Sequence, residues 1–136
     1  MTDTATEMRS VVIERELPHP PDRVWRALTE PHLIAEWLMK ADFKAHVGHR
    51  FDFRAEWGTV ACEVLAVEPN RTLSYTWNVR DLASTVTWTL TPTPNGTHLR
   101  MEQSGFRPDQ PEYYEGAKYG WPRFFAGLEQ VLARAA

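Results

Sequence analysis

The stretch TLSYTWNVRDLASTVTWTLTPTPNGTHLRMEQ, residues 72–103, decides the fold of this chain, because its hydrophobicity repeats with a period of two. Three runs within it, 73–79, 86–90 and 99–103, place apolar and polar side chains at alternate positions. Such alternation is typical of strands that bury one face. The turn residues at 94–96, Pro-Asn-Gly, predict a hairpin between the last two runs. This part of the chain is therefore expected to form an antiparallel meander.

The same period continues toward the N-terminus. Residues 43–47 and 51–57 alternate in the same way, and residues 59–67 are apolar on both faces. A further β-branched run at 10–17 ends at Pro18, which cannot continue a central strand. The sequence therefore predicts a curved antiparallel sheet of about six to seven strands.

The C-terminal segment has a helical period instead. Its apolar residues recur at steps of three and four, which is typical of a helix with one buried stripe. These residues are Tyr114, Ala117, Trp121, Phe125, Leu128 and Leu132. Pro122 lacks a backbone N–H and clashes with the preceding turn, so we expect a kink or a restart near Gly120.

Two short helices are expected after the first strand, where Val24 and Leu28, and then Ile34 and Trp37, recur at helical spacing. Pro31 suits the first turn of the second helix. The sheet must cover its apolar face, and only the C-terminal helix is long enough to do so. We therefore predict an α+β fold with a flexible tail at residues 1–9 and a single domain at residues 10–136.

Composition narrows the function. The net charge is -3 and no block of Lys or Arg occurs, which argues against a nucleic-acid partner. The single cysteine, Cys62, cannot form an internal disulfide, and no apolar run is long enough to insert in a membrane. We expect a cytoplasmic protein that is a monomer or a homodimer. No phosphate loop, dinucleotide fingerprint, serine elbow or zinc motif is present, so we expect no cofactor.

Five segments resemble a known family: VWRALTEP at 24–31, VLAVEPNRTLSYTW at 64–77, TVTWTL at 85–90, SGF at 104–106 and GW at 120–121. Their order resembles the helix-grip fold of the START-like (SRPBCC) superfamily, and most closely the family named for the activator of heat-shock protein 90 ATPase. Similar proteins include lipid carriers, antibiotic-sequestering proteins and aromatic cyclases. The resemblance implies an apolar ligand held between sheet and helix. The extra N-terminal domain of the eukaryotic co-chaperones is not expected here.

Aromatic residues supply the candidate ligand site. They make up 12% of the chain, with six Trp, and large rings on both layers are hard to interdigitate without a gap. An apolar gap with a few polar groups is typical of a ligand pocket, although plain core packing would use the same rings. The candidate pocket residues are Phe53, Trp57, Glu63, Tyr75, Trp77, Trp88, Met101, Gln103, Phe106, Tyr114, Trp121 and Phe125.

Among these, Glu63 and Gln103 are polar residues at positions expected to face inward. Each could anchor a ligand or move a proton, and Glu63 could instead pair with an arginine or turn outward at a bulge. The preferred hypothesis is binding of an apolar or aromatic molecule that is lipid-, polyketide- or hormone-like. The alternatives are a cyclase- or dehydratase-type enzyme using Glu63, Tyr75 or Gln103, and a chaperone-interacting protein.

The remaining chemistry-bearing residues give weaker signals. His46 and His49 lie across a Gly turn without a third ligand pattern, so no metal site is expected. Cys62 stands among Val and Ala, which is typical of a packing residue, and no catalytic residue is assigned.

Overall fold

The computed structural model describes residues 8–134 and contains six strands and three helices, so most of the predicted tail lies outside the described residues. The strands are β1 (Arg9–Leu17), β2 (Arg50–Ala55), β3 (Gly58–Glu68), β4 (Thr72–Val79), β5 (Leu82–Thr93) and β6 (Gly96–Phe106). The helices are α1 (Pro21–Thr29), α2 (Pro31–Trp37) and α3 (Pro111–Arg134).

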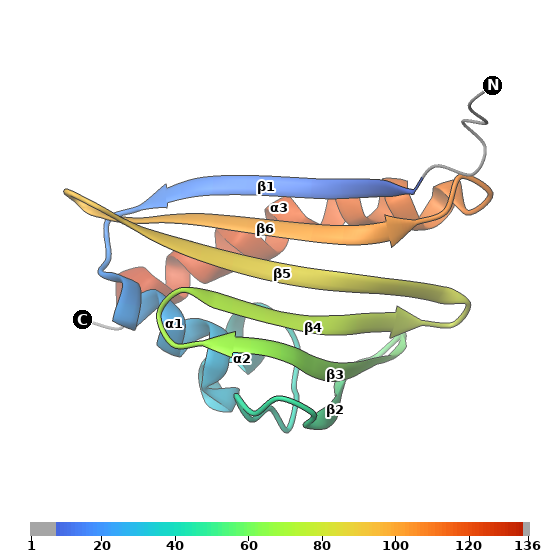
Figure 1. Cartoon of the computed structure of the whole chain (residues 1–136), viewed down its shortest axis with the longest axis horizontal. Helices are drawn as coiled ribbons and strands as arrows, with labels where there is room; N and C mark the ends of the chain where they lie inside the picture. The colour runs from blue at the N-terminus through green and yellow to red at the C-terminus, as the bar shows by residue number, and fades with distance from the viewer. Residues whose placement is uncertain (1–7, 135–136) are drawn as a thin grey trace.

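All six strands form one antiparallel sheet with the order β1-β6-β5-β4-β3-β2, and α3 lies across one of its faces (Figure 1). The helices α1 and α2 lie on the same side of the sheet, where α1 contacts β5 and β6 and α2 packs against α1 and α3 (Figure 1). The alternation in β4 and β5 places Trp77 and Trp88 on the covered face, where both are buried. The predicted α+β helix-grip architecture is confirmed.

The strand predicted at residues 43–47 is wrong. Residues 43–47 form no strand, and the nearby Lys40 makes an isolated bridge with Arg54. Phe43 is nevertheless buried, with its ring 5.1 Å from that of Phe51. The backbone then turns at Gly48, whose N–H donates to the Val64 carbonyl at 2.8 Å. Phe43 is buried and a turn follows it, and this combination gave residues 43–47 an alternation of apolar and polar residues like that of a strand.

The two short helices are confirmed, and they meet at Glu30, which ends α1 and precedes α2. The Trp37 indole N–H donates to the Ala27 carbonyl at 2.8 Å and ties the two helices together. The long helix α3 runs through Pro122 without a break, so the anticipated restart does not occur. Trp121 and Phe125 are both buried, and these contacts hold the turns on either side of Pro122 in place.

The helices in the described part of the chain were also compared with the requirements of a bilayer span. None of those between residues 8 and 134 is both long enough and apolar enough to cross a membrane.

Strand β1 is bound to β6 by a charged cross-strand cluster on the outer face. His98 is 2.8 Å from a carboxylate oxygen of Glu14 and 2.6 Å from one of Glu16. Hydrogen bonding to Glu14 and then to Glu16 raises the pKa of His98 above its ordinary 6.5. Protonated His98 therefore stabilises the fold below pH 6.5, and the contribution is lost as the pH rises through the raised pKa.

We expect His98→Gln to destabilise the protein more at pH 5.5, where the carboxylates are still ionised, than at pH 8.5. The effect should be small, because the cluster is exposed. Thermal unfolding of both proteins across this range measures the difference. A gap in melting temperature that stays constant with pH would contradict the assignment.

Candidate functional site

Aromatic rings fill the middle of the interface between the sheet and α3. The Trp121 ring of α3 lies 5.2 Å from that of Trp77 and 5.7 Å from that of Trp88. Phe125, one turn further along α3, lies 5.7 Å from Trp88. These edge and tilted contacts are typical of well-packed rings. The centre of the interface is therefore solid core.

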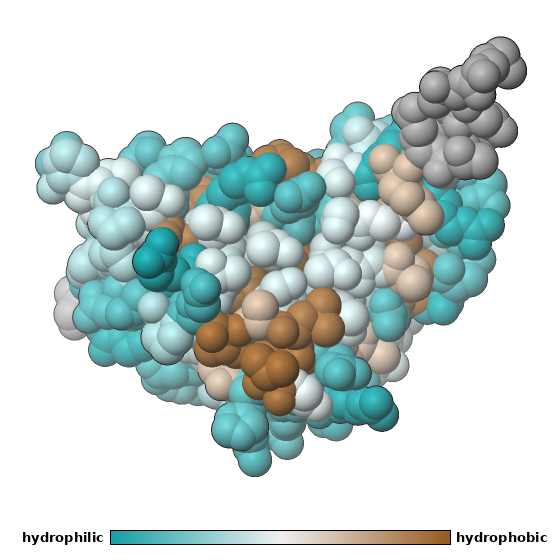
Figure 2. Space-filling model, viewed as in Figure 1, coloured by the Kyte–Doolittle hydropathy of each residue, from teal (hydrophilic) through white to brown (hydrophobic). Residues whose placement is uncertain are grey.

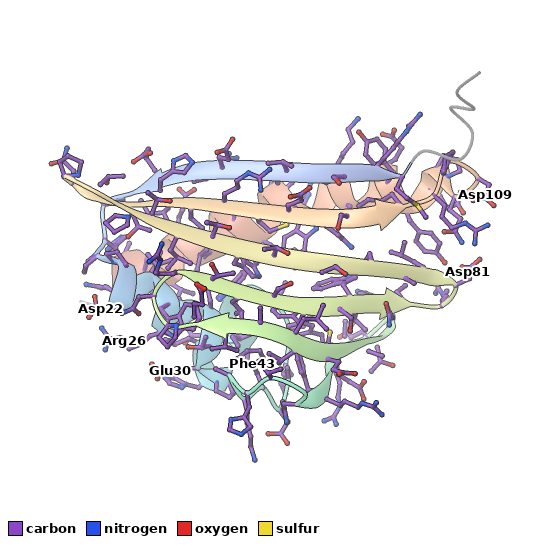
Figure 3. The ribbon with its side chains drawn as sticks, in the orientation of Figure 1. Asp22, Arg26, Glu30, Phe43, Asp81 and Asp109 are labelled. Carbon is purple, nitrogen blue, oxygen red and sulfur yellow. The ribbon has the colours of Figure 1, made fainter. Side chains whose placement is uncertain are left out.

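A cavity of about 210 Å³ remains at one end of this interface, and it is partly open to solvent. It lies between the N-terminal half of α3 and the strands β4, β5 and β6. Asp81 in the β4–β5 turn marks this end of the molecule, and Asp109 of the loop before α3 lies at the same end (Figure 3). The lining residues are Trp57, Trp77, Val79, Leu82, Gln103, Phe106, Glu112, Tyr113, Gly116, Ala117, Gly120, Trp121 and Phe124.

A chain of hydrogen bonds holds the buried amide of Gln103 in the cavity wall. The Trp121 indole donates to Gln103 Oε1 at 2.7 Å, and Gln103 Nε2 donates to Ser84 Oγ at 3.0 Å. The Ser84 hydroxyl donates in turn to the Trp77 carbonyl at 2.6 Å. An indole N–H can only donate, so it fixes which end of the amide faces Trp121. One N–H and one lone pair of the amide remain without a partner in this chain of bonds.

A bulge in β6 positions the neighbouring Phe106. Arg9 pairs with Phe106 and Ser10 with Ser104, which leaves Gly105 as the extra residue. Gly105 has a φ of +107°, and a side chain there would bring its Cβ within 2.9 Å of the Ala83 carbonyl oxygen. Glycine is therefore required at the turn that places Phe106, which is fully buried, in the cavity wall.

The mouth of the cavity is more polar than its wall. The Tyr113 hydroxyl donates to an Asp81 carboxylate oxygen at 2.5 Å, and this bond lowers the pKa of Asp81 and raises the pKa of Tyr113. Glu112 lines the cavity from the first turn of α3 and is exposed. Trp57, in the β2–β3 turn, is 57% exposed. The mouth thus combines two carboxylates with two aromatic rings.

The structure divides the predicted pocket residues into three groups. Those that line the cavity are Trp57, Trp77, Gln103, Phe106 and Trp121. Those that are buried in the core without lining it are Phe53, Tyr75, Trp88, Met101 and Phe125. Tyr114 is half-buried, with its ring 5.7 Å from that of Phe106, and does not line the cavity either. The core group was misplaced because these rings do interdigitate across most of the interface.

Glu63 does not line the cavity, although it was a candidate pocket residue, and it pairs with an arginine, which was the alternative expected for it. The inner face of β3 is taken by Cys62 and Val64, and the Glu63 side chain is 41% exposed beside Arg50, whose Nε lies 3.4 Å away. The Tyr75 hydroxyl is buried, accepts the Trp88 indole N–H at 3.0 Å, and has its pKa raised by that burial. Glu63, Tyr75 and Gln103 therefore do not converge in the cavity as proton-handling groups.

Sequence reasoning missed several wall residues. Leu82 shares the inward parity of Val86, but the run of alternation at 86–90 does not reach back to it. Gly116 and Gly120 lie four apart on α3, and small residues at this spacing could have indicated the open space. Tyr113 and Phe124 lie beside the apolar stripe and carried no clear signal.

The structure also describes the surroundings of the possible metal ligands and of Cys62. Across residues 8–134 no three His, Cys, Asp or Glu side chains lie close enough to hold a metal ion. Cys62 is buried, and its burial raises the pKa of the thiol, which disfavours the reactive thiolate.

A curved antiparallel sheet gripping a C-terminal helix, with an apolar cavity between the layers, defines a protein of the helix-grip class. Residues 18–133 match the family described as Activator of Hsp90 ATPase homolog 1-like protein. The chain belongs to that family, as its five sequence segments indicated.

Solved structures of other proteins are similar to this one. Protein MLL2253 from Mesorhizobium loti is 66% identical over 94% of this chain and 99% of its own, with a TM-score of 0.92. DynU16, from the dynemicin biosynthetic locus, is 28% identical over 92% of this chain and 47% of its own, with a TM-score of 0.82. Protein BH1534 from Bacillus halodurans is 27% identical over 91% and 96%, with a TM-score of 0.80. None of the curated proteins matches the chain.

We expect Gln103→Met to lower the free energy of unfolding by about 1–3 kcal/mol, because it leaves the buried Trp121 N–H without an acceptor. Trp121→Phe should destabilise as well, but the double variant should lose less than the sum of the two. Urea unfolding of the four proteins in the cycle measures this coupling. Met101→Leu, a buried change on the same strand outside the hydrogen-bond chain, is the control. Strictly additive losses would contradict the role of the bond.

Proposed function

We propose that this chain binds a small aromatic or otherwise apolar molecule in the end cavity. The observation that carries the proposal is the lining of this cavity, which has six aromatic side chains and a single amide held in one orientation. An apolar cavity of roughly 150 Å³ is enough for benzene. The volume of about 210 Å³ therefore suits a group of one or two rings.

The side-chain amide of Gln103 has hydrogen-bonding capacity left, which could make the cavity selective for ligands with a polar group. Its remaining N–H and lone pair are available to a hydroxyl or carbonyl of the bound group. Ligand pockets usually combine an apolar wall with a few such polar groups, although roughly 300–1,000 Å³ is a more common size. A longer ligand of lipid-, polyketide- or hormone-like character would extend through the open mouth past Trp57.

Binding is favoured over cyclase- or dehydratase-type catalysis, because the candidate proton handlers do not meet. Glu63 lies on the surface, Tyr75 lies in the core, and only Gln103 faces the cavity. The similarity to DynU16, from a biosynthetic locus, agrees with a small organic molecule as the ligand. The proposal includes a cytoplasmic location, which the buried free thiol of Cys62 supports.

A chaperone-interacting role would need a different surface. Figure 2 shows hydrophobic side chains gathered on the outer face of the sheet over β3, where Leu65 is 44% exposed. Val47, 65% exposed, lies nearby because its neighbour Gly48 bonds to Val64. This patch faces away from α3, and no feature of the described residues beside it indicates which partner it would bind. The cavity therefore supports a more specific function than the patch does.

We expect indole and 2-naphthol to bind the wild-type protein saturably with one site, and Gly120→Leu to weaken this binding at least tenfold. A Cβ at Gly120 meets no atom within 4 Å, so a larger side chain can occupy the open space. Titration followed by amide chemical shifts measures affinity and location together, and the shifts should cluster in β5, β6 and the first half of α3.

The control is Gly127→Ala, on the same helix but beside Trp37, where the added Cβ makes an ordinary contact at 3.4 Å. It should leave both affinities unchanged. If neither probe binds wild type, or if a folded Gly120→Leu binds as tightly as wild type, the proposed site is wrong.

A further inference from the structure

The end cavity has a charge pattern that its apolar character alone does not explain. Among the lining residues the single charged side chain is Glu112, and none is Lys, Arg or His. Six of the lining residues are aromatic, and the faces of aromatic rings carry negative partial charge. The described lining residues thus supply one carboxylate, aromatic rings whose faces can attract a cation, and no compensating cation.

We infer that the ligand of this cavity is an organic cation: an aromatic molecule with an ammonium group that sits at the mouth, near Glu112. This inference rests on the proposed function and adds the charge of the ligand. A cation over aromatic faces is attracted by the ring quadrupole, and the attraction grows where water is excluded. A carboxylate at the mouth adds direct charge pairing.

The cations at this end of the molecule lie outside the cavity wall. Asp81 stays ionised, because the hydrogen bond from Tyr113 lowers its pKa. Arg107 is held by Asp109 through two hydrogen bonds of 3.0 and 2.6 Å, which leaves that pair close to neutral. Arg80, in the turn beside Asp81, does not line the cavity. Arg9 and Lys118 lie over the Tyr114 ring and do not line the cavity either. Glu112 is therefore the one charged side chain that the described residues place in the cavity wall.

The opposite end of the molecule shows that the pattern is local. A second cavity of about 210 Å³, between α1, α2 and the C-terminal end of α3, is lined by Arg23, Arg26 and His32 as well as Glu30. Arg26 and Glu30 lie at the end of the molecule opposite Asp81 and Asp109 (Figure 3). The cationic residues that line this second cavity thus lie away from the aromatic cavity. An anionic ligand would find no partner in the aromatic cavity, and a neutral one would leave Glu112 unused.

Three probes of nearly equal shape test the charge: benzyltrimethylammonium, neutral neopentylbenzene and anionic phenylmethanesulfonate. We expect wild type to bind the cation roughly tenfold more tightly than the neutral probe, and the anion most weakly. Glu112→Gln should weaken binding of the cation several-fold and leave the neutral probe unchanged. Glu115→Gln is the matched control, since Glu115 is on the same helix, pairs with Lys118 at 3.8 Å and does not line the cavity.

The outcomes separate the two proposals. If wild type binds the neutral probe as tightly as the cation, the inferred charge is wrong and the apolar site stands. If the cation preference survives Glu112→Gln, or is lost equally in Glu115→Gln, the assignment of the charge to Glu112 is wrong. If no probe binds, and indole and 2-naphthol also fail, the proposed function falls together with this inference.

Discussion

The packing of Trp121 against the sheet is the contact on which the arrangement of α3 depends. The Trp121 ring packs on Trp77 of β4 and Trp88 of β5, and its N–H is buried among them. A buried donor of this kind needs an acceptor, and Gln103 of β6 supplies it. The Gln103 amide donates to the Ser84 hydroxyl, which donates in turn to the backbone carbonyl of Trp77. One indole therefore sets the helix height and the polar positions of three strands.

The position of the cavity follows from the order of residue sizes along α3. Before Trp121 the inward side of the helix carries Gly116, Ala117 and Gly120, and after it come larger residues such as Phe125. The large residues fill the interface beside them, and the small residues leave open space. A packed core and a cavity thus arise from one helix without any break at Pro122.

The two periodicities were enough to predict the architecture, because each reports which face of an element is buried. The period of two in β4, β5 and β6 and the helical period of α3 do not depend on distant partners. The strand predicted at residues 43–47 was wrong, because one buried residue, Phe43, followed by a turn gives the same alternating pattern as a strand. The orientation of Glu63 stayed open, because a strand that is apolar on both faces gives no parity of its own. The rings lining the cavity could not be separated from the rings filling the core, since that depends on the height of α3 over the sheet.

The residues that form the mouth of the cavity differ from those that stabilise the fold. The mouth is formed by Trp57 in the β2–β3 turn, Tyr113 in the first turn of α3, and Asp81 in the β4–β5 turn that binds it. Turns and helix ends bury little apolar surface, so they open at lower free energy than the core does. The Trp121 cluster lies behind them, and its contacts involve none of the mouth residues. Under the proposed function, a molecule would enter past the half-exposed Trp57 while Trp121 and Gln103 stay in place, so the amide would already be oriented before binding.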